Sequence, residues 1–255
     1  CIPFAWAWMV PAQIRDLSQS YTAVVLFASN ILFYMKSGYF EAASEEAPLL
    51  HTWSLAVEEQ YYMVFPIFLI VLWKFGRNPI LYAIVALSIV SLIMSEWGWR
   101  NNPSANFYLA PTRAWELLAG SICAFLQFNT AQKSNNALSV TGLGLIVFAF
   151  FYYDKTTPFP SVYALAPVVG TALIILYGAS ETWVARLLSL KAFVGVGLIS
   201  YSAYLWHQPL FAFARIRSIQ AEPSHWLMLG LSGTSLLLAY LTWLYIEHPF
   251  RKRPI

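Results

Sequence analysis

Long apolar runs separated by short polar loops fill most of the chain, and they predict membrane-spanning helices. A helix needs about 20 largely apolar residues to cross the hydrocarbon core of a bilayer. Runs of roughly this length follow one another from residue 53 onward: 53–73, 80–97, 113–128, 138–153, 162–177, 193–213 and 226–246. We therefore predict an all-α fold, a polytopic transmembrane helical bundle with about seven complete spans.

Two stretches at the N-terminal end depart from this pattern. Residues 1–11 are too short to span a bilayer and start inside apolar sequence without an initiator Met, which predicts a truncated first helix. Residues 21–40 have spanning length, but they carry Ser29, Asn30 and Lys36 and precede an acidic loop. This second stretch either crosses the membrane or forms a re-entrant segment.

Composition supports a membrane protein and argues against other classes. Hydrophobic residues make up 59% of the chain and charged residues 11%, about half of what a soluble domain carries. The net charge of +3 comes from scattered residues without a basic stripe, so nucleic-acid binding has no support. Cys1 and Cys123 lie in apolar sequence without paired spacing, and we interpret them as buried thiols that form neither a disulfide nor a metal site.

The orientation in the membrane follows from Lys and Arg in the short loops, which favour the cytoplasmic side. If the seven spans alternate, the more basic side carries Lys74, Arg77, Lys133, Arg186, Lys191, Arg251, Lys252 and Arg253. The opposite side carries Arg100, Lys155, Arg215 and Arg217. We expect the first side to be cytoplasmic, which places the acidic loop 41–46 and the loop before Arg113 outside.

Polar, ionisable and aromatic residues crowd together in one stretch that starts at His51 and runs directly into an apolar span. In a helix, His51, Ser54 and Glu58 lie on one face, with Glu59 and Gln60 beside it. Two adjacent carboxylates at the mouth of an apolar span cost several kcal/mol unless they are paired, hydrated or protonated. They are either functional or interfacial residues that reach headgroup water.

A second polar face lies in the middle of a later span. Ser200, Tyr204 and His207 share one helix face there, just before a proline. The histidine either has a function or forms a hydrogen bond within a helix that the proline kinks. Gly195 and Gly197, where this helix is entered, permit close helix packing.

Charged residues recur at two other span ends. Arg113 and Glu116 are three residues apart, and they form either a simple intrahelical ion pair or a fork that binds a phosphate or carboxylate. Glu247 and His248 precede a basic tail, and we interpret them as interfacial. The sequence contains no phosphate-binding glycine loop, zinc-protease motif or nucleophile elbow.

Three ordered motifs resemble one family. They are Leu49-Leu50-His51-Thr52-Trp53-Ser54-Leu55 with Glu58-Glu59-Gln60-Tyr61-Tyr62, preceded by Ser29-Asn30 and Gly38-Tyr39-Phe40; Ser200-Tyr201-Ser202-Ala203-Tyr204-Leu205-Trp206-His207-Gln208-Pro209; and Tyr245-Ile246-Glu247-His248-Pro249-Phe250-Arg251. These motifs are similar to those of membrane-bound acyltransferase family 3. Its members are O-acetyltransferases that modify bacterial cell-surface polysaccharides.

The resemblance covers residues 1–255 and implies a single integral-membrane acyltransferase domain that lacks its N-terminal two to three helices. The family's ten spans fit the count if residues 21–40 do not cross. The missing part would contain the family's proposed catalytic histidine, so we expect this stretch alone to insert into the membrane without catalysing transfer. The resemblance further implies the bacterial inner membrane as location and allows for an esterase-like domain after residue 255.

The family's reaction would move an acyl group, most often acetyl, from acyl-CoA to a sugar hydroxyl of a polysaccharide such as lipopolysaccharide O-antigen. A hydroxyl that attacks a thioester needs a base and groups that stabilise the oxyanion. The resemblance assigns catalysis to Glu58, His51 and Ser54, with Glu58 orienting or polarising the missing histidine. The residues it assigns to substrate binding are Trp53, Glu59, Gln60, Tyr61, Arg113, Glu116, Ser200, Tyr204 and His207. Acetyl-CoA would be a donor substrate, and we expect no permanently bound cofactor or metal.

Two other functions fit the same residues. In a transporter or flippase for a lipid-linked sugar or an anionic solute, the intramembrane Glu, Arg and His residues would form an ion pathway. The lack of a detectable inverted repeat disfavours this alternative. A structural membrane subunit is the third candidate, and it leaves Glu58, Glu59 and His207 without a purpose.

Overall fold

The computed structural model describes residues 1–37, 46–128, 130, 132–154, 156–218 and 223–251. Within these ranges the secondary structure is helical and contains no strand, which confirms the all-α prediction. Several residues used in the predictions lie outside the described ranges: Gly38, Tyr39 and Phe40 of the first motif, Glu41 and Glu45 of the acidic loop, and the basic residues Lys155, Lys252 and Arg253.

The chain divides into two compact units. The first unit contains residues 1–56 and 191–255, and the second contains residues 57–190. Helix α4, Thr52–Leu72, begins in the first unit and continues in the second. Each unit is described by itself below.

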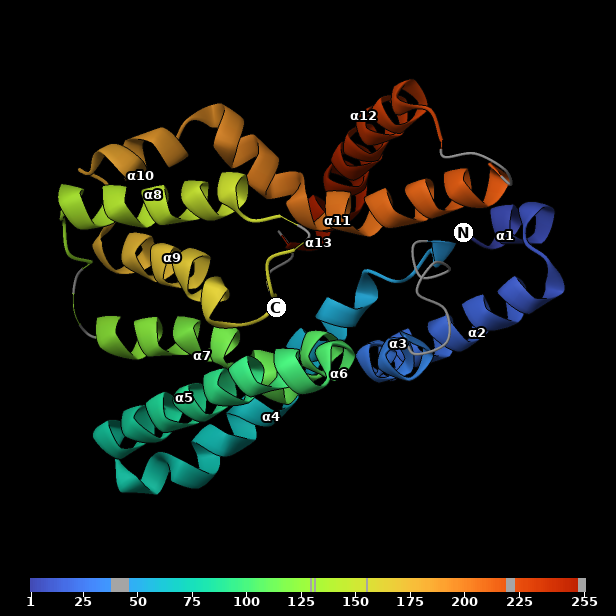
Figure 1. Ribbon diagram of the computed structural model, residues 1–255. Helices are drawn as coiled ribbons and strands as arrows, with labels where there is room; N and C mark the ends of the chain where they lie inside the picture. Colours follow the sequence, from blue (N-terminus) through green and yellow to red (C-terminus); the bar gives the residue numbers. More distant parts are fainter. Residues whose placement is uncertain (38–45, 129, 131, 155, 219–222, 252–255) are drawn as a thin grey trace. The chain divides into compact units, whose positions relative to one another are not determined.

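In the first unit, helix α11 packs along α12, and α1 lies against α11 (Figure 1). The helices of this unit are α1 (Ile2–Trp8), α2 (Pro11–Val25), α3 (Ser29–Ser37), α11 (Lys191–Arg217), α12 (His225–Thr242) and α13 (His248–Arg251), and a π-helical segment, Trp243–Glu247, joins the last two. A small apolar core of Ala5, Leu17, Phe213 and Ile216 fixes α1 and α2 to the C-terminal half of α11.

The stretch predicted to cross or return is broken into two short helices. Helix α2 ends at Val25, α3 begins at Ser29, and Phe27 between them has a φ of 52°, which interrupts a helix. With 15 and 9 residues, the two helices extend over about 22 Å and 13 Å, and each is shorter than the hydrocarbon core of a bilayer. No single helix therefore spans the described part of this stretch, although its path relative to the membrane stays a prediction.

In the second unit, α5 packs along α7, α8 packs along α9, and α7 contacts α9. The helices are α5 (Arg77–Asn101), α6 (Pro103–Tyr108), α7 (Ala110–Gln127), α8 (Asn136–Tyr152), α9 (Leu165–Tyr177) and α10 (Trp183–Leu188), with short 3-10 turns at Trp73–Phe75 and Val162–Ala164. Ile80, Ile84 and Leu118 form the buried core, against which Tyr61 and Phe65 of α4 pack.

Two glycines allow α8 and α9 to approach closely. A Cβ added to Gly142 would lie 2.6 Å from the carbonyl oxygen of Gly170, and one added to Gly170 would lie 2.6 Å from the carbonyl oxygen of Gly142. Gly195 and Gly197 do not make such an approach to a described residue, because an added Cβ at either position would meet no atom within 4 Å. Glycine in an apolar helix permits close packing, but only the partner helix decides where it occurs.

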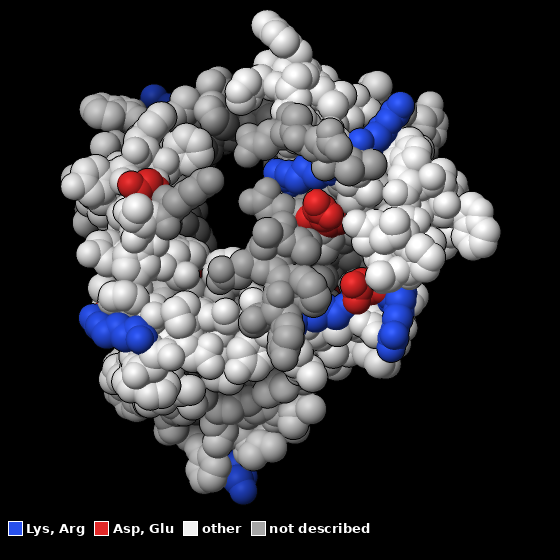
Figure 2. Space-filling view, turned by 45° about the vertical axis from the view of Figure 1, so that its right-hand side comes forward, with Lys and Arg blue, Asp and Glu red and all other residues white. Residues whose placement is uncertain are grey.

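Every predicted span coincides with a helix, but the described helices differ in length and apolarity. Three of them are long and apolar enough to cross a membrane, Thr52–Phe75, Arg77–Asn101 and His225–Arg251, and two shorter apolar helices cover Asn136–Tyr152 and Val162–Tyr177. Large apolar side chains such as Ile70, Ile93 and Leu229 are exposed, as lipid contact requires. Most of the face shown in Figure 2 is uncharged, with isolated Lys, Arg, Asp and Glu. The structure thus supports a helical membrane protein, and the count of seven spans stays a prediction.

Candidate active site

The predicted site residues fall into two sets, one in each unit. The first unit contains His51, Trp53, Ser54, Ser200, Tyr204 and His207. The second unit contains Glu58, Glu59, Gln60, Tyr61, Arg113 and Glu116.

In the first unit, a short turn positions the start of α4. The Thr52 hydroxyl donates to the carbonyl of Leu49 (2.6 Å), and the buried Ser29 hydroxyl of α3 donates to the carbonyl of Thr52 (2.8 Å). From α11, the Gln208 side-chain amide donates to the carbonyl of Ala47 (3.2 Å). These bonds explain why Ser29 and Gln208 belong to the motifs, because they fix the backbone that carries His51 and Ser54.

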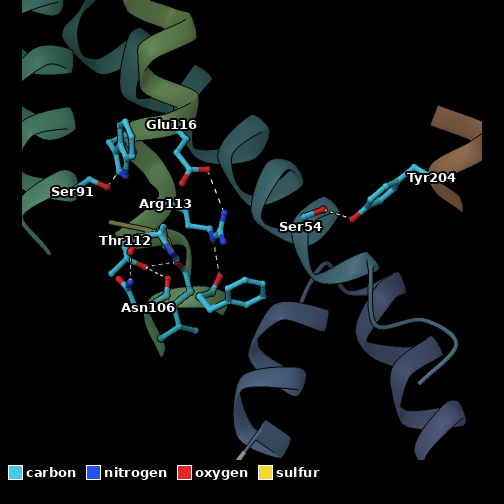
Figure 3. A network of polar contacts seen from close by, with 11 residues as sticks. Ser54, Ser91, Asn106, Thr112, Arg113, Glu116 and Tyr204 are labelled. Carbon is cyan, nitrogen blue, oxygen red and sulfur yellow. Dashed lines mark hydrogen bonds and ion pairs between the residues drawn. The ribbon is translucent and has the colours of Figure 1, made fainter. Parts of the chain in front are cut away.

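Tyr204 joins the central helix to α11 across 150 residues of sequence. Its hydroxyl oxygen lies 2.6 Å from Ser54 Oγ (Figure 3). The same oxygen lies 2.5 Å from the carbonyl oxygen of His51. The structure therefore brings together Ser54, His51 and Tyr204. Ser200, predicted on the same helix face, is instead exposed, and its hydroxyl donates to the carbonyl of Gly197 in its own helix.

The His51 ring lies between Tyr204 and His207. The distances between ring centroids are 5.1 Å to Tyr204 and 5.5 Å to His207. His51 is 7% exposed, and neither of its ring nitrogens has a hydrogen-bond partner in the part of the chain that the structure describes. Burial, followed by the proximity of His207, lowers the pKa of His51 from 6.5 to about 4. His51 is therefore a neutral imidazole at physiological pH.

His207 forms the local hydrogen bond that the sequence allowed for. Its Nδ1 lies 2.6 Å from the carbonyl oxygen of Tyr204, three residues earlier in α11. A carbonyl oxygen accepts only, so Nδ1 carries the proton. In the neutral ring, Nε2 is then a hydrogen-bond acceptor.

In the second unit, Arg113 is buried and bound by protein groups on several sides. Its Nε donates to the carbonyl of Phe107 (2.7 Å), and one terminal nitrogen lies 3.3 Å from Glu116 Oε2 (Figure 3). The guanidinium carbon also lies 4.9 Å from the ring centroid of Phe107 and 5.5 Å from that of Phe159. These are the contacts expected for the intrahelical ion pair, reinforced by two aromatic rings.

Three further side chains hold the junction between α6 and α7, from which Arg113 projects. The Ser91 hydroxyl donates to the carbonyl of Pro111 (2.6 Å), the Thr112 hydroxyl to that of Asn106 (2.8 Å), and the Asn106 amide to that of Pro160 (2.7 Å). We missed these residues in the sequence, where the Asn-rich and Pro-rich segment 99–112 indicated only a polar loop. Small polar residues beside prolines were the available signal, because α6 ends at Tyr108 and its last carbonyls need partners outside the helix.

Glu116 lines a cavity between α7 and α9. The cavity has a volume of about 240 Å³ and is lined by Glu116, Ala119, Gly120, Cys123, Pro167, Val168, Thr171, Ala172 and Ile175. Oε1 of Glu116 is buried and accepts no hydrogen bond from any residue that the structure describes. One carboxylate oxygen is thus paired with Arg113, and the other is left in a largely apolar wall.

The acidic pair on α4 is less enclosed. Glu58, Glu59, Gln60 and Tyr61 are all half-buried, and the Tyr61 hydroxyl shares a 2.6 Å hydrogen bond with Ser121 of α7. The carboxylates of Glu58 and Glu59 form no hydrogen bond or ion pair with any residue that the structure describes. The catalytic assignment of Glu58 stays a prediction.

Glu247 is largely covered by protein groups, and its interfacial position stays a prediction. Its side chain is only 13% exposed, accepts a hydrogen bond from Ser202 and lies 3.6 Å from Arg251. Trp206 donates to Thr242 (2.9 Å) on the same side of α11. The wider turn of the π-helical segment Trp243–Glu247 brings positions five residues apart towards one face, which regular helical spacing does not predict.

The chain offers few groups that could hold a metal. No cluster of three or more His, Cys, Asp or Glu occurs in the described ranges. Both cysteines are free; Cys123 is buried, as predicted, whereas Cys1 is only half-buried.

Comparisons with known proteins identify related sequences. The profile of a family described as an acyltransferase domain matches residues 3–244. The chain is 27% identical to the peptidoglycan O-acetyltransferase OatA of Listeria monocytogenes, over 95% of this chain and 42% of that protein. It is 30% identical to the putative O-acetyltransferase SACOL0978 of Staphylococcus aureus (91% and 41% covered) and 27% identical to the putative peptidoglycan O-acetyltransferase YrhL of Bacillus subtilis (95% and 44%). The chain spans about two fifths of the length of these relatives. No solved structure matches it.

Proposed function

The chain belongs to acyltransferase family 3, whose acyltransferase domain it matches, and on that premise we propose that it is the membrane part of an O-acyltransferase acting on a cell-surface polysaccharide. The match over residues 3–244 carries this proposal. The relatives named as O-acetyltransferases support acetyl as the group transferred. The apolar helices support a membrane location, for which we propose the bacterial inner membrane in a multi-pass arrangement.

The donor in this proposal is acyl-CoA, and the acceptor is a sugar hydroxyl. The motifs alone led us to expect lipopolysaccharide O-antigen as an example of the acceptor. The names of two relatives favour peptidoglycan instead. Both glycans carry free sugar hydroxyls, so the assay below includes both.

The reaction needs a base for the hydroxyl proton and groups that stabilise the thioester oxyanion. A base is most effective when its pKa lies near the working pH, whereas the pKa of His51 is about 4. We therefore assign His51 a hydrogen-bonding role and expect the base to be another group. Glu58 would orient or polarise that base, and the buried Arg113 would contribute positive charge from α7.

The second candidate function is a transporter or flippase. The observation that favours it is the ion pair between the buried Arg113 and the half-buried Glu116 in an apolar helix, which is typical of ion pathways as well as of active sites. A transporter or flippase function does not explain the match to the acyltransferase domain.

An assay with labelled acetyl-CoA separates the candidates. Membranes from cells that produce the full-length protein are incubated with acetyl-CoA that carries the label in its acetyl group, and with either peptidoglycan or lipopolysaccharide. We expect label in one glycan, released by mild base because O-acetyl esters hydrolyse under those conditions. Label that stays in acetyl-CoA, combined with protein-dependent movement of a lipid-linked sugar across the membrane, would support the transporter.

A further inference from the structure

The hydroxyl groups at the start of α4 form a chain of short hydrogen bonds that ends on a backbone carbonyl. The His51 carbonyl accepts only, so the 2.5 Å contact assigns the single Tyr204 hydroxyl proton to it. The 2.6 Å contact between Tyr204 and Ser54 then requires the Ser54 proton, with the Tyr204 oxygen as acceptor. The competing contact from Ser54 Oγ to the His51 carbonyl is much longer, at 3.4 Å. Ser54 is therefore left with oxygen lone pairs and no proton to offer a ligand.

The neighbouring His207 ring also offers a hydrogen-bond acceptor. Because Nδ1 of His207 lies against the carbonyl oxygen of Tyr204, Nε2 is the ring nitrogen at which His207 can accept a hydrogen bond. Ser54 and His207 are both half-buried and both contact Tyr204, whereas the neutral His51 ring is buried beside them. Ser54 and His207 thus present two hydrogen-bond acceptors beside their shared partner, Tyr204.

We propose that Ser54 Oγ and His207 Nε2 form a recognition site for a ligand that donates two hydrogen bonds, and that this ligand is a sugar of the acceptor glycan, which donates from its hydroxyl or amide N–H groups. Tyr204 is the positioning residue, since it removes the Ser54 proton from the site and orients His207 through its carbonyl. This inference rests on the proposed function, because it takes the acceptor to be a glycan.

The same chemistry disfavours the phosphate groups of the other substrate at this site. CoA carries phosphates, which are acceptors with negative charge, and lone pairs on Ser54 and His207 would repel them. A sugar hydroxyl can donate its proton to either group. The site should therefore discriminate between glycan and CoA, and its loss should weaken glycan binding alone.

Binding measurements on the purified full-length protein in nanodiscs test this without relying on turnover. The two probes are CoA and soluble glycan fragments from de-O-acetylated peptidoglycan, each followed by saturation-transfer NMR over a concentration series. The variants are Ser54→Ala, Tyr204→Phe and the double variant. Tyr201→Phe is the matched control, because Tyr201 is exposed on the same helix three residues away.

We expect Ser54→Ala and Tyr204→Phe to weaken glycan binding about tenfold each and to leave CoA binding within twofold of wild type. The double variant should be no weaker than Ser54→Ala, because Tyr204 acts on the glycan through Ser54. A second pair of variants separates the two nitrogens of His207. His207→Asn keeps a donor near Nδ1 and should lose glycan binding, whereas His207→Gln keeps an acceptor near Nε2 and should retain most of it.

The proposal is overturned if the variants bind glycan as Tyr201→Phe does, or if they weaken CoA binding equally, which would indicate a general structural role. Thermal unfolding identifies any variant that fails to fold, and the His207 pair then decides the outcome. Failure of the proposed function would appear separately, as an absence of acetyl transfer by wild-type protein that still binds glycan.

Discussion

Several buried polar side chains of this chain bond to a backbone carbonyl, and two residues with unpaired buried atoms belong to the candidate site. Ser29, Ser91 and Asn106 each donate to a carbonyl of another segment. By contrast, the ring nitrogens of His51 and Oε1 of Glu116 are buried without a partner among the described residues. An unpaired buried polar group costs about 1–3 kcal/mol, so these two positions are destabilising unless a ligand uses them.

The acidic pair on α4 gives a matched test at the residue scale. In the full-length protein, Glu58→Gln should lower acetyl transfer more than tenfold, equivalent to about 1.4 kcal/mol of barrier, because the amide keeps the shape and removes the charge. Glu59→Gln is the control and should have a smaller effect. Rates are measured with labelled acetyl-CoA, and equal, small losses for both variants would instead support interfacial roles.

Burial of neutral His51 makes stability depend on pH. Its pKa is about 4 in the folded protein and about 6.5 when unfolded, so the unfolded state binds the proton first as the pH falls. Stability is fully present above pH 6.5 and is lost towards pH 4, by about 2 kcal/mol between pH 7 and pH 5. Thermal unfolding in detergent should show this loss in wild type and a smaller one in His51→Gln.

The control for this pH dependence is His225→Gln, because His225 is exposed at the start of α12. This variant should lose as much stability as wild type between pH 7 and pH 5. If His51→Gln and wild type respond to acid identically, His51 is not a buried neutral histidine.

At the scale of elements, apolar run length predicted where helices lie but not how they end or pack. Each predicted span coincides with a helix, because in a membrane backbone groups must be satisfied within each helix. The break at Phe27 and the π-helical segment Trp243–Glu247 were not predictable, since neither contains a proline or glycine. The close contact at Gly142 and Gly170 depends on which helices become neighbours, and no single run contains that information.

In the candidate site, too, contacts within one helix were predictable from the sequence and contacts between helices were not. The Arg113–Glu116 pair follows from helical spacing alone, because residues three apart lie on one face. The contact of Ser54 with Tyr204 joins positions 150 residues apart, so sequence periodicity could identify each helix face but not their pairing.

The α8–α9 contact can be tested by a single methyl group. Gly142→Ala places its Cβ 2.6 Å from the carbonyl oxygen of Gly170, so one helix must shift, and we expect a loss of about 1–3 kcal/mol in stability. Gly144→Ala, two residues away, meets no atom within 4 Å and should be neutral or slightly stabilising. Stability is measured by thermal unfolding, and an equal loss in both variants would contradict the close packing of α8 and α9.

At the scale of the whole molecule, the distribution of loop charges predicts an orientation. Asn78 and Asn101 are exposed near opposite ends of α5, which is long enough to cross a membrane. With Cys1 and Cys123 replaced, Asn101→Cys should react with a membrane-impermeant thiol reagent in intact spheroplasts, whereas Asn78→Cys should react only after lysis. Labelling of Asn78→Cys alone would reverse the orientation.

The central claim is that this chain belongs to an enzyme that places acyl groups on sugar hydroxyls. The most direct measurement is mass spectrometry of cell-surface glycans from cells with the intact gene, with the gene deleted and with the gene restored as Glu58→Gln. We predict O-acetyl groups, removable by mild base, that disappear on deletion and return only weakly with the variant. Identical O-acetylation in all three strains, in both peptidoglycan and lipopolysaccharide, would contradict the claim.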